Sequence, residues 1–297
     1  MLKRTIYIGT PTSLKLKDKQ LIIGDPLTKE VKGSVPIEDM AVLVLDHYQI
    51  TISHQAIVML QQHNVAIISC DQSHLPLGLM LPFHGHVVYS ERLKHQINCS
   101  EPLRKQLWKQ TVEAKIFQQK TLLEKLDFDA QPMHQYLNQV KSGDSTNMEG
   151  IAAQYYWKQL FECSFKRERE GDVPNNYLNF GYSILRSMVA RALVSSGLNP
   201  TIGIFHRNKY NPYCLADDIM EPYRPFVDEL VFEWMNKPFR PTELDKQAKA
   251  YLLTIATKDV KIDGLIRPLL VAISSTTSSL YKCFSGEQRI IRYPMFT

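Results

Sequence analysis

The chain has 297 residues, of which 44% are apolar, so it can form one large domain or two of ordinary size. Lysine and arginine together number 35, against 30 aspartates and glutamates, which gives a net charge of +5 and a sequence pI near 8.8. This mildly basic balance favours a polyanionic partner, but charge alone does not establish nucleic-acid binding.

The cysteines and the apolar runs argue against several classes of protein. Five scattered cysteines form no C-x-x-C pair, so neither a zinc site nor a disulfide framework is indicated, and a reducing compartment is favoured. The opening residues, MLKRTIYIG, lack the apolar core of a signal peptide, and no apolar run approaches the roughly 18 residues of a membrane span. We therefore expect a soluble, cytoplasmic protein with no membrane partner.

Short strand-like runs dominate the first 70 residues, with glycine and aspartate between them. One amphipathic insert follows Ser53, a good N-cap residue, and predicts a short helix between two strands. Residues 75–86 then contain Pro76, Gly78, Pro82 and Gly85, which predict a linker. The strand-like runs are RTIYIG, SLKLK, LIIGD, AVLVLD, ITIS and VAIIS.

Beyond residue 85 the apolar periodicity becomes helical, with long helical segments over residues 92–126, 147–170 and 176–200. Five lysines between positions 105 and 125 fit a solvated helix face. The sequence therefore predicts an α+β protein: a small β-rich, β-sandwich-like N-terminal domain (1–85) and a larger all-α domain (86–297). Because exposed sheet edges are commonly buried against a second copy, we expect the N-terminal domain to mediate dimerisation.

Glu149 follows Thr146 at the spacing of a capping box, in which the glutamate only satisfies a backbone N–H. It also opens a helical stripe that continues with Ala153, Tyr156 and Leu160 and is otherwise apolar. If that face is packed, a positive group must meet the carboxylate, because an unpaired buried charge is costly. The residues alone leave cap and functional site equally open.

His206, Asp218 and Glu221 lie within sixteen positions, after the strand-like run TIGIF. Asp218 and Glu221 share one face of any helix that begins there, and a helix start or a satisfied histidine would explain each residue singly. Together they offer two carboxylates and an imidazole, a set suited to Mg²⁺ or Mn²⁺ rather than to zinc. Such a set fits phosphodiester chemistry.

Four blocks occur in order along the chain, namely MEGIAAQYYW, NNYLNFGYSILRSMVARAL, GLNPTIGIFHRN and LADDIMEPYRP. Over the whole chain they resemble the signature of the CRISPR-associated spacer-acquisition endonuclease/integrase family. The stretch HRNKYNPYCLADD most resembles the branch found beside single-effector, RNA-guided nucleases, a type II setting. The resemblance implies Glu149, His206 and Glu221 as metal ligands and Asp218 as a supporting acid.

One position departs from the family pattern. Members often carry arginine where this chain has Gln154, so we expect a phosphate contact there to be weak or to come from Lys158. Asn176 and Asn179 match family asparagines, and we assign them no chemistry. The cations that we expect to line a phosphate path are Lys158, Lys166, Arg167, Arg186 and Arg191.

The resemblance also implies a reaction and an assembly. A homodimer pairs with the small second universal CRISPR-associated protein, two dimers bridged by one, in a heterohexamer that other adaptation subunits or the effector nuclease can assist. The complex holds a short foreign DNA duplex and joins its 3′-hydroxyls to a CRISPR repeat by metal-dependent transesterification. Other hypotheses remain: a structure-selective DNA repair nuclease, an inactive DNA-binding scaffold and a helical protein-interaction adaptor.

Overall fold

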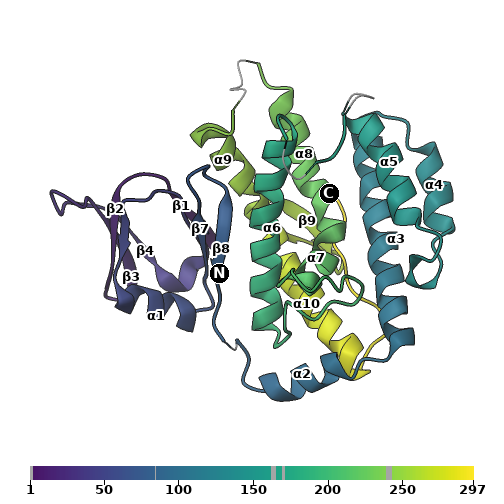
Figure 1. Cartoon of the computed structure of the whole chain (residues 1–297), viewed down its shortest axis with the longest axis horizontal. Helices are drawn as coiled ribbons and strands as arrows, with labels where there is room; N and C mark the ends of the chain where they lie inside the picture. Colours follow the sequence, from purple (N-terminus) through teal and green to yellow (C-terminus); the bar gives the residue numbers. More distant parts are fainter. Residues whose placement is uncertain (1–2, 84, 162–164, 169–170, 239–242) are drawn as a thin grey trace. The chain divides into compact units, whose positions relative to one another are not determined.

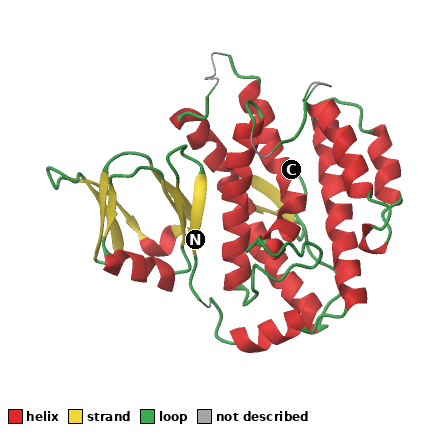
Figure 2. Cartoon of the chain, viewed as in Figure 1, coloured by secondary structure: helices red, strands yellow, loops and turns green. Residues whose placement is uncertain are grey.

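The computed structural model describes residues 3–83, 85–161, 165–168, 171–238 and 243–297. It divides into two compact units, Met1–Gly85 and His86–Thr297 (Figure 1). Strands make up most of the first unit and helices most of the second (Figure 2), which confirms the predicted α+β class. The dimerisation role of the first unit stays a prediction.

The N-terminal unit contains two four-stranded sheets. In one, β1, β5 and β7 run parallel and β8 pairs antiparallel with β7, giving the order β1-β5-β7-β8. In the other, of order β4-β3-β2-β6, only the β2–β6 pair is parallel. The elements are β1 (Arg4–Ile8), β2 (Thr12–Lys17), β3 (Gln20–Gly24), β4 (Val31–Pro36), β5 (Met40–Leu45), β6 (Ile50–Ile52), α1 (His54–Gln62), β7 (Ala66–Cys70) and β8 (Pro76–Met80).

Alternating side chains build the core of this unit. Leu14 of β2 is buried while its neighbour Lys15 is exposed, as expected of a strand with one face inward. Leu14 belongs to one apolar cluster with Leu43 of β5 and Leu60 of α1, so both sheets and the helix enclose a single core. The side chain of Ser53 accepts the backbone N–H of Ala56, which confirms the predicted N-cap of α1.

The predicted linker over residues 75–86 is wrong in its first part, because Pro76–Met80 form strand β8. β8 lies at the edge of its sheet, where the missing N–H of Pro76 leaves no ladder bond unmade. Gly78 also fits the pairing, because a Cβ there would lie 2.5 Å from the Ser69 hydroxyl of β7. The edge position explains why strand-breaking residues are tolerated here.

The second unit is organised around α6, most of whose residues are buried and which packs against α7, α8, α9 and α10. The long helix α3 packs against α4, α5 and α8 and also contacts α7. Gly181 permits close packing of α6 on α8, since a Cβ there would lie 2.4 Å from Val227 Cγ1. The helices are α2 (Tyr89–Ile97), α3 (Glu101–Lys125), α4 (Gln131–Asn138), α5 (Met148–Leu160), α6 (Asn175–Ser195), α7 (Cys214–Met220), α8 (Arg224–Met235), α9 (Lys246–Leu252) and α10 (Leu269–Ser285).

Several details of the second unit differ from the sequence prediction, and the segment predicted over 92–126 forms two helices, α2 and α3. The unit also holds a hairpin of β9 (Asp259–Ile262) and β10 (Leu265–Pro268), whose Asp263-Gly264 turn has positive φ at both residues. The helix predicted over 147–170 ends at Leu160, residues 162–164 and 169–170 of that prediction lie outside the described part of the chain, and the run TIGIF is a loop rather than a strand. The Asp-Gly pair is a hairpin signal that helical periodicity on either side obscures.

Two predictions from composition can be compared with the described residues. Cys70, Cys99, Cys214 and Cys283 are free, and Cys163 lies outside the described part of the chain. No helix in the described ranges is long and apolar enough to cross a membrane.

Candidate active site in the helical unit

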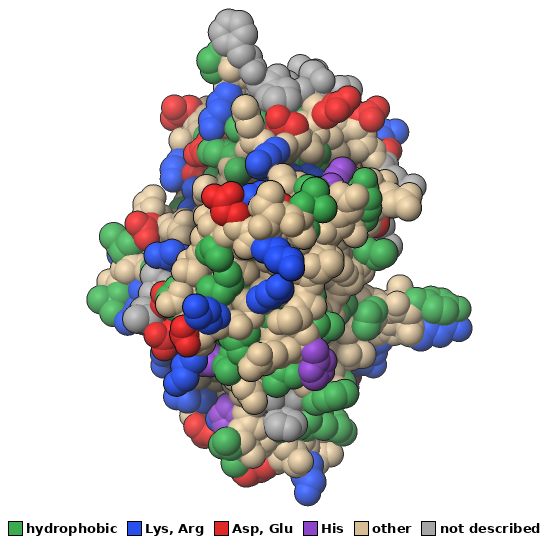
Figure 3. All heavy atoms as spheres, turned by 90° about the vertical axis from the view of Figure 1, so that its left-hand side faces the viewer, with side chains coloured by type: hydrophobic (Ala, Val, Ile, Leu, Met, Phe, Trp, Pro, Cys, Tyr) green, Lys and Arg blue, Asp and Glu red, His purple; other side chains and the backbone are tan. Residues whose placement is uncertain are grey.

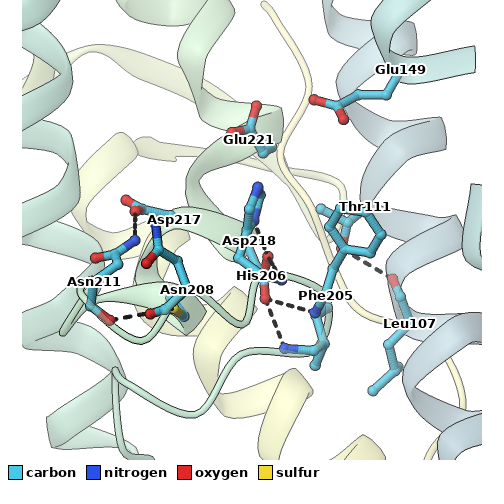
Figure 4. Close-up of polar contacts among 12 residues, drawn as sticks. Leu107, Thr111, Glu149, Phe205, His206, Asn208, Asn211, Asp217, Asp218 and Glu221 are labelled. Atoms are coloured by element: carbon cyan, nitrogen blue, oxygen red, sulfur yellow. Dashed lines mark hydrogen bonds and ion pairs between the residues drawn. The ribbon is translucent and has the colours of Figure 1, made fainter. Parts of the chain in front are cut away.

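Two glutamates from different helical segments approach one lysine. The ammonium of Lys115, on α3, lies 2.5 Å from Glu149 Oε1 of α5 and 2.6 Å from Glu221 Oε2 at the start of a short 3-10 turn between α7 and α8. Figure 4 shows the two carboxylates pointing toward each other across the gap between their helices. Lys115, Glu149 and Glu221 thus form one charged cluster, although they lie on three different segments and the first and last are 106 positions apart in the sequence.

Glu149 is not a capping-box residue. The side chain of Asp144 accepts the backbone N–H groups of Met148 (2.8 Å) and Glu149 (3.0 Å), so the first turn of α5 is capped from outside the helix. The Glu149 carboxylate is left to meet Lys115, and the side chain stays 25% exposed. The positive group required by a charge on this packed face is present, and the cap interpretation of Glu149 is wrong.

Glu221 is buried and doubly paired. Besides Lys115, it accepts an ion pair from Arg224 Nη2 at 2.9 Å, one turn further along. Burial alone would raise the pKa of this carboxyl, but the charges of Arg224 and Lys115 outweigh it and lower the pKa to about 2. The carboxylate therefore remains ionised at any pH at which the protein would work.

His206 lies in the loop between α6 and α7, and Asp218 fixes it there. Asp218 is fully buried and accepts the backbone N–H groups of Ile204, Phe205 and His206. Its Oδ1 also lies 2.6 Å from His206 Nδ1, and this hydrogen bond raises the pKa of the imidazole against the opposing effect of burial. With Nδ1 occupied, Nε2 is the nitrogen left for chemistry, and Figure 4 shows the ring reaching from Asp218 toward Glu221.

Close packing fixes the same loop. A Cβ at Gly203 would lie 2.4 Å from the carbonyl oxygen of His206 and 2.8 Å from Asp218 Oδ2, so only glycine permits this turn. Phe205 stacks on Trp108 of α3, with ring centroids 4.2 Å apart and planes 2° from parallel. The imidazole also meets the edge of Trp108, so α3 supports the loop that carries His206.

The predicted ligands are near one another, but they are not gathered around a single point. Across the described ranges, no three His, Cys, Asp or Glu side chains are close enough to hold a metal ion. Glu149 and Glu221 converge instead on the Lys115 ammonium, while His206 is paired with Asp218. The two carboxylates already share one positive charge, that of the Lys115 ammonium. Carboxylate oxygens placed in this way, with the His206 imidazole nearby, fit a hard divalent ion such as Mg²⁺ or Mn²⁺.

The comparisons with known proteins show the family of the chain. The sequence model described as "CRISPR associated protein Cas1" matches residues 6–263. The CRISPR-associated endonuclease Cas1 of Neisseria meningitidis is 33% identical over 278 residues, which cover 93% of this chain and 90% of that protein. The chain belongs to the Cas1 family. Glu149, His206, Asp218 and Glu221 all lie within the matched region.

Two solved structures show the same fold at lower identity. A casposase bound to its integration product has a TM-score of 0.79 and 22% identity, covering 98% of this chain and 92% of that one. A chain of a Cas6-RT-Cas1–Cas2 complex has a TM-score of 0.73 and 20% identity, covering 97% of this chain and 35% of that one. These likenesses support the Cas1 fold assignment.

Two site residues of this Cas1-family chain were missed by the sequence analysis. Lys115 was assigned to a solvated face with the other lysines of α3, which is wrong for this residue, since it is only 8% exposed. Positions 108, 111, 115, 118 and 122 of α3 are all buried and follow three- and four-residue steps, so the helical period did contain the signal. Arg224 lies in the Pro-Tyr-Arg-Pro stretch, three residues after Glu221, and this i,i+3 spacing was the signal that could have predicted their ion pair.

The five predicted DNA-contact cations differ in their surroundings. Lys158 and Lys166 are exposed, whereas Arg167 donates to Asn175 and Asn179, and Arg186 forms a bidentate pair with Asp217. Arg191 is 7% exposed, so burial removes it from the surface that a DNA backbone can reach. On the face drawn in Figure 3, basic side chains are scattered among acidic and apolar ones, so that face alone marks no phosphate path.

Proposed function

We propose that the protein is a metal-dependent DNA endonuclease/integrase of CRISPR adaptation, which inserts short foreign DNA into the CRISPR array by transesterification. The observation that carries the proposal is that the carboxylates of Glu149 and Glu221 converge on one positive charge, the Lys115 ammonium, with the imidazole of His206 directed toward Glu221. Membership of the Cas1 family supports it. The casposase with the same fold, bound to an integration product, supports it further.

Glu149, Glu221 and the Nε2 atom of His206 would hold Mg²⁺ or Mn²⁺. A divalent ion there would neutralise charge on the scissile phosphate and lower the pKa of the attacking 3′-hydroxyl. Asp218 is a positioning residue, because its four contacts with the loop fix the tautomer and the direction of the His206 ring.

The remaining requirements of the reaction fall on the protein. One phosphodiester bond replaces another, so no external energy source is required, and alignment of the 3′-hydroxyl with the scissile phosphate is the main task. Trp108 and Phe205 fix the loop so that the imidazole is held before DNA arrives. His206 Nε2, when not engaged as a ligand, is also the atom that can transfer a proton.

The partners follow from the same assignment. We propose that a homodimer binds double-stranded prespacer and repeat DNA and joins the small second universal CRISPR-associated protein in a heterohexamer. The solved Cas6-RT-Cas1–Cas2 complex, which contains a chain of this fold, supports a partner of the Cas2 kind. The 33% identity to the Neisseria meningitidis protein is compatible with the type II-like branch, and we place the protein in the cytoplasm.

The experiment is strand transfer in vitro. A labelled duplex with free 3′-hydroxyls is incubated with a supercoiled repeat plasmid, the protein and the small partner, with Mg²⁺, Mn²⁺ or EDTA. We expect label to join the plasmid at the repeat boundaries only with metal and partner present. Asp218→Asn should reduce joining about 10- to 100-fold, as loss of a supporting contact does.

The other hypotheses give different results in the same assay. A structure-selective repair nuclease would hydrolyse branched DNA without the partner and would not favour the repeat. A scaffold would bind the duplex in a salt-dependent manner without joining it, and an adaptor would show no such affinity. Any of these three results would contradict the proposed integrase activity.

A further inference from the structure

Lys115 occupies a position that is unusual for a structural ion pair. Its ammonium donates a short charge-assisted hydrogen bond to Glu149 Oε1 at 2.5 Å and forms an ion pair with Glu221 Oε2 at 2.6 Å. The lysine side chain is 10% exposed, and Glu221 is 7% exposed. A single charge therefore bridges two carboxylates on different segments, which is the role that a bound cation plays.

The other cation of the cluster is held differently. Arg224 contacts the second oxygen of Glu221 and also lies over the ring of Tyr182, 4.6 Å from its centroid. A planar guanidinium that is both paired and stacked is fixed, whereas lysine carries a point charge on a flexible four-carbon stem. Of the two cations, Lys115 is therefore the mobile one, and Arg224 keeps Glu221 paired when the lysine withdraws.

We propose that Lys115 is an internal counter-ion for Glu149 and Glu221 that a divalent cation displaces when it binds; this rests on the proposed function of the same site. Before metal binds, the ammonium keeps the two carboxylates together and prevents their mutual repulsion. A divalent ion supplies twice the charge to the same two oxygens, and the lysine stem swings aside. The lysine thus prepares the site and competes with the metal for it.

The first test compares metal affinity in two matched variants. Wild type, Lys115→Met and Lys109→Met are stripped with EDTA, and Mn²⁺ binding is measured by electron paramagnetic resonance of the free ion. Lys109 is a control on the same helix, paired with Glu113 at the surface. We expect Lys115→Met to bind Mn²⁺ about tenfold more tightly or better, because no ammonium competes, and Lys109→Met to match wild type.

Thermal unfolding gives a second readout. Without metal, Lys115→Met leaves Glu149 facing Glu221 with only Arg224 nearby, so its melting temperature should fall below that of wild type. Saturating Mn²⁺ should restore it, giving a larger metal-induced shift than in wild type. The double variant Lys115→Met/Glu149→Gln should regain stability in EDTA and lose the metal-induced shift.

A measurement on wild type keeps the inference testable if Lys115→Met does not fold. Amine-reactive labelling, read by mass spectrometry, should find Lys115 protected in EDTA and modified once Mn²⁺ is added, with Lys109 unchanged. Equal protection in both conditions would overturn displacement. So would unchanged or weaker Mn²⁺ binding by Lys115→Met, provided that wild type binds and Glu149→Gln does not. Failure of wild type to bind Mn²⁺ at all would overturn the proposed function as well.

Discussion

Two buried carboxyl groups lie close together along the chain, Glu221 and Asp228 of α8, and each is at the centre of a cluster of polar side chains. The Asp228 carboxyl accepts the hydroxyl of Tyr156, from α5, at 2.8 Å and also that of Tyr182, from α6. The Glu221 carboxylate instead forms ion pairs with two charged side chains, those of Lys115 and Arg224. Both are almost fully buried, so burial alone does not separate a structural carboxylate from a functional one.

The partners make the difference. A tyrosine hydroxyl on a buried ring cannot leave its acceptor without disrupting the core, so Asp228 is a closed junction between α5, α6 and α8. A lysine stem can turn away and open the Glu149–Glu221 pair to another cation. Because α5 carries both Tyr156 and Glu149, the closed junction also fixes the helix that presents the open site.

The largest expected effect separates the two clusters by activity. Glu149→Gln and Glu221→Gln should each reduce strand transfer more than about 100-fold, because a carboxylate facing the cation is lost. His206→Ala should do the same. Stability should change by about 1 kcal/mol or less for Glu149→Gln, since Lys115 keeps Glu221 as a partner.

The matched control is Asp228→Asn, whose carboxyl lies in the closed cluster. It should retain strand transfer while its stability changes. Strand transfer by Glu149→Gln at near wild-type rate in saturating metal would contradict the comparison. So would an equal loss of activity in Asp228→Asn and in the three site variants, if all four are equally well folded. Duplex affinity, measured in parallel, should change little in every variant.

The next effect concerns the loop that carries His206. Gly203→Ala places a Cβ against the His206 carbonyl and the Asp218 carboxylate, and because the closest atom is backbone, the loop must move. A displacement of about 1 Å should reduce strand transfer about 100-fold while Mn²⁺ still binds weakly. Gly33→Ala is the control, because a Cβ there meets nothing within 4 Å. Full activity of Gly203→Ala would show that the loop does not hold the imidazole.

The closed cluster has a pH signature of its own. Burial raises the pKa of Asp228 from 3.8 to about 7, so between these values the folded carboxyl keeps a proton that the unfolded chain releases. The contribution of Asp228 to stability is therefore full below about pH 4 and declines as pH rises to about 7. Urea unfolding at pH 5 and pH 7.5 should show wild type losing stability relative to Asp228→Asn. Parallel profiles would contradict the raised pKa.

The smallest effects concern DNA affinity. Lys158→Ala and Lys166→Ala should each lower the log–log salt slope of duplex binding by about 1, since each removes one phosphate contact. Lys17→Ala, an exposed lysine of the N-terminal unit, is the control. Arg191→Ala should act through stability rather than through the slope, because the guanidinium is buried. An unchanged slope in the double variant Lys158→Ala/Lys166→Ala would place the phosphate path elsewhere.

The sequence could predict what depends on local pattern. The Ser53 cap and the six strand-like runs predicted for the first unit follow from residue chemistry, and the structure confirms each, whereas strand β4 was not predicted. Strand β8 could not be predicted, because its proline is tolerated only at a sheet edge, and edge position is a property of the assembled sheet. The α+β class was therefore predictable, and the complete strand set was not.

For the site, the sequence supplied the acids and the histidine but not their partners. Glu149 could not be separated from a cap until Asp144 was seen to cap the helix. Lys115 was hidden among lysines of one helix, and only the packing of α3 against α5 and the 3-10 turn shows that it is buried against Glu149 and Glu221. Long-range ion pairs of this kind leave no spacing in the sequence that would reveal them.

The most direct test of the central claim is the position of manganese in a crystal. Crystals soaked in Mn²⁺ would be measured at the manganese absorption edge, where anomalous scattering locates the ion without reference to the protein. We predict one ion held by Glu149, Glu221 and His206 Nε2, at about 2.0–2.3 Å from each, with Lys115 turned away from both carboxylates. Lys115 still bridging the two glutamates at saturating Mn²⁺, with no anomalous peak beside them, would contradict the account.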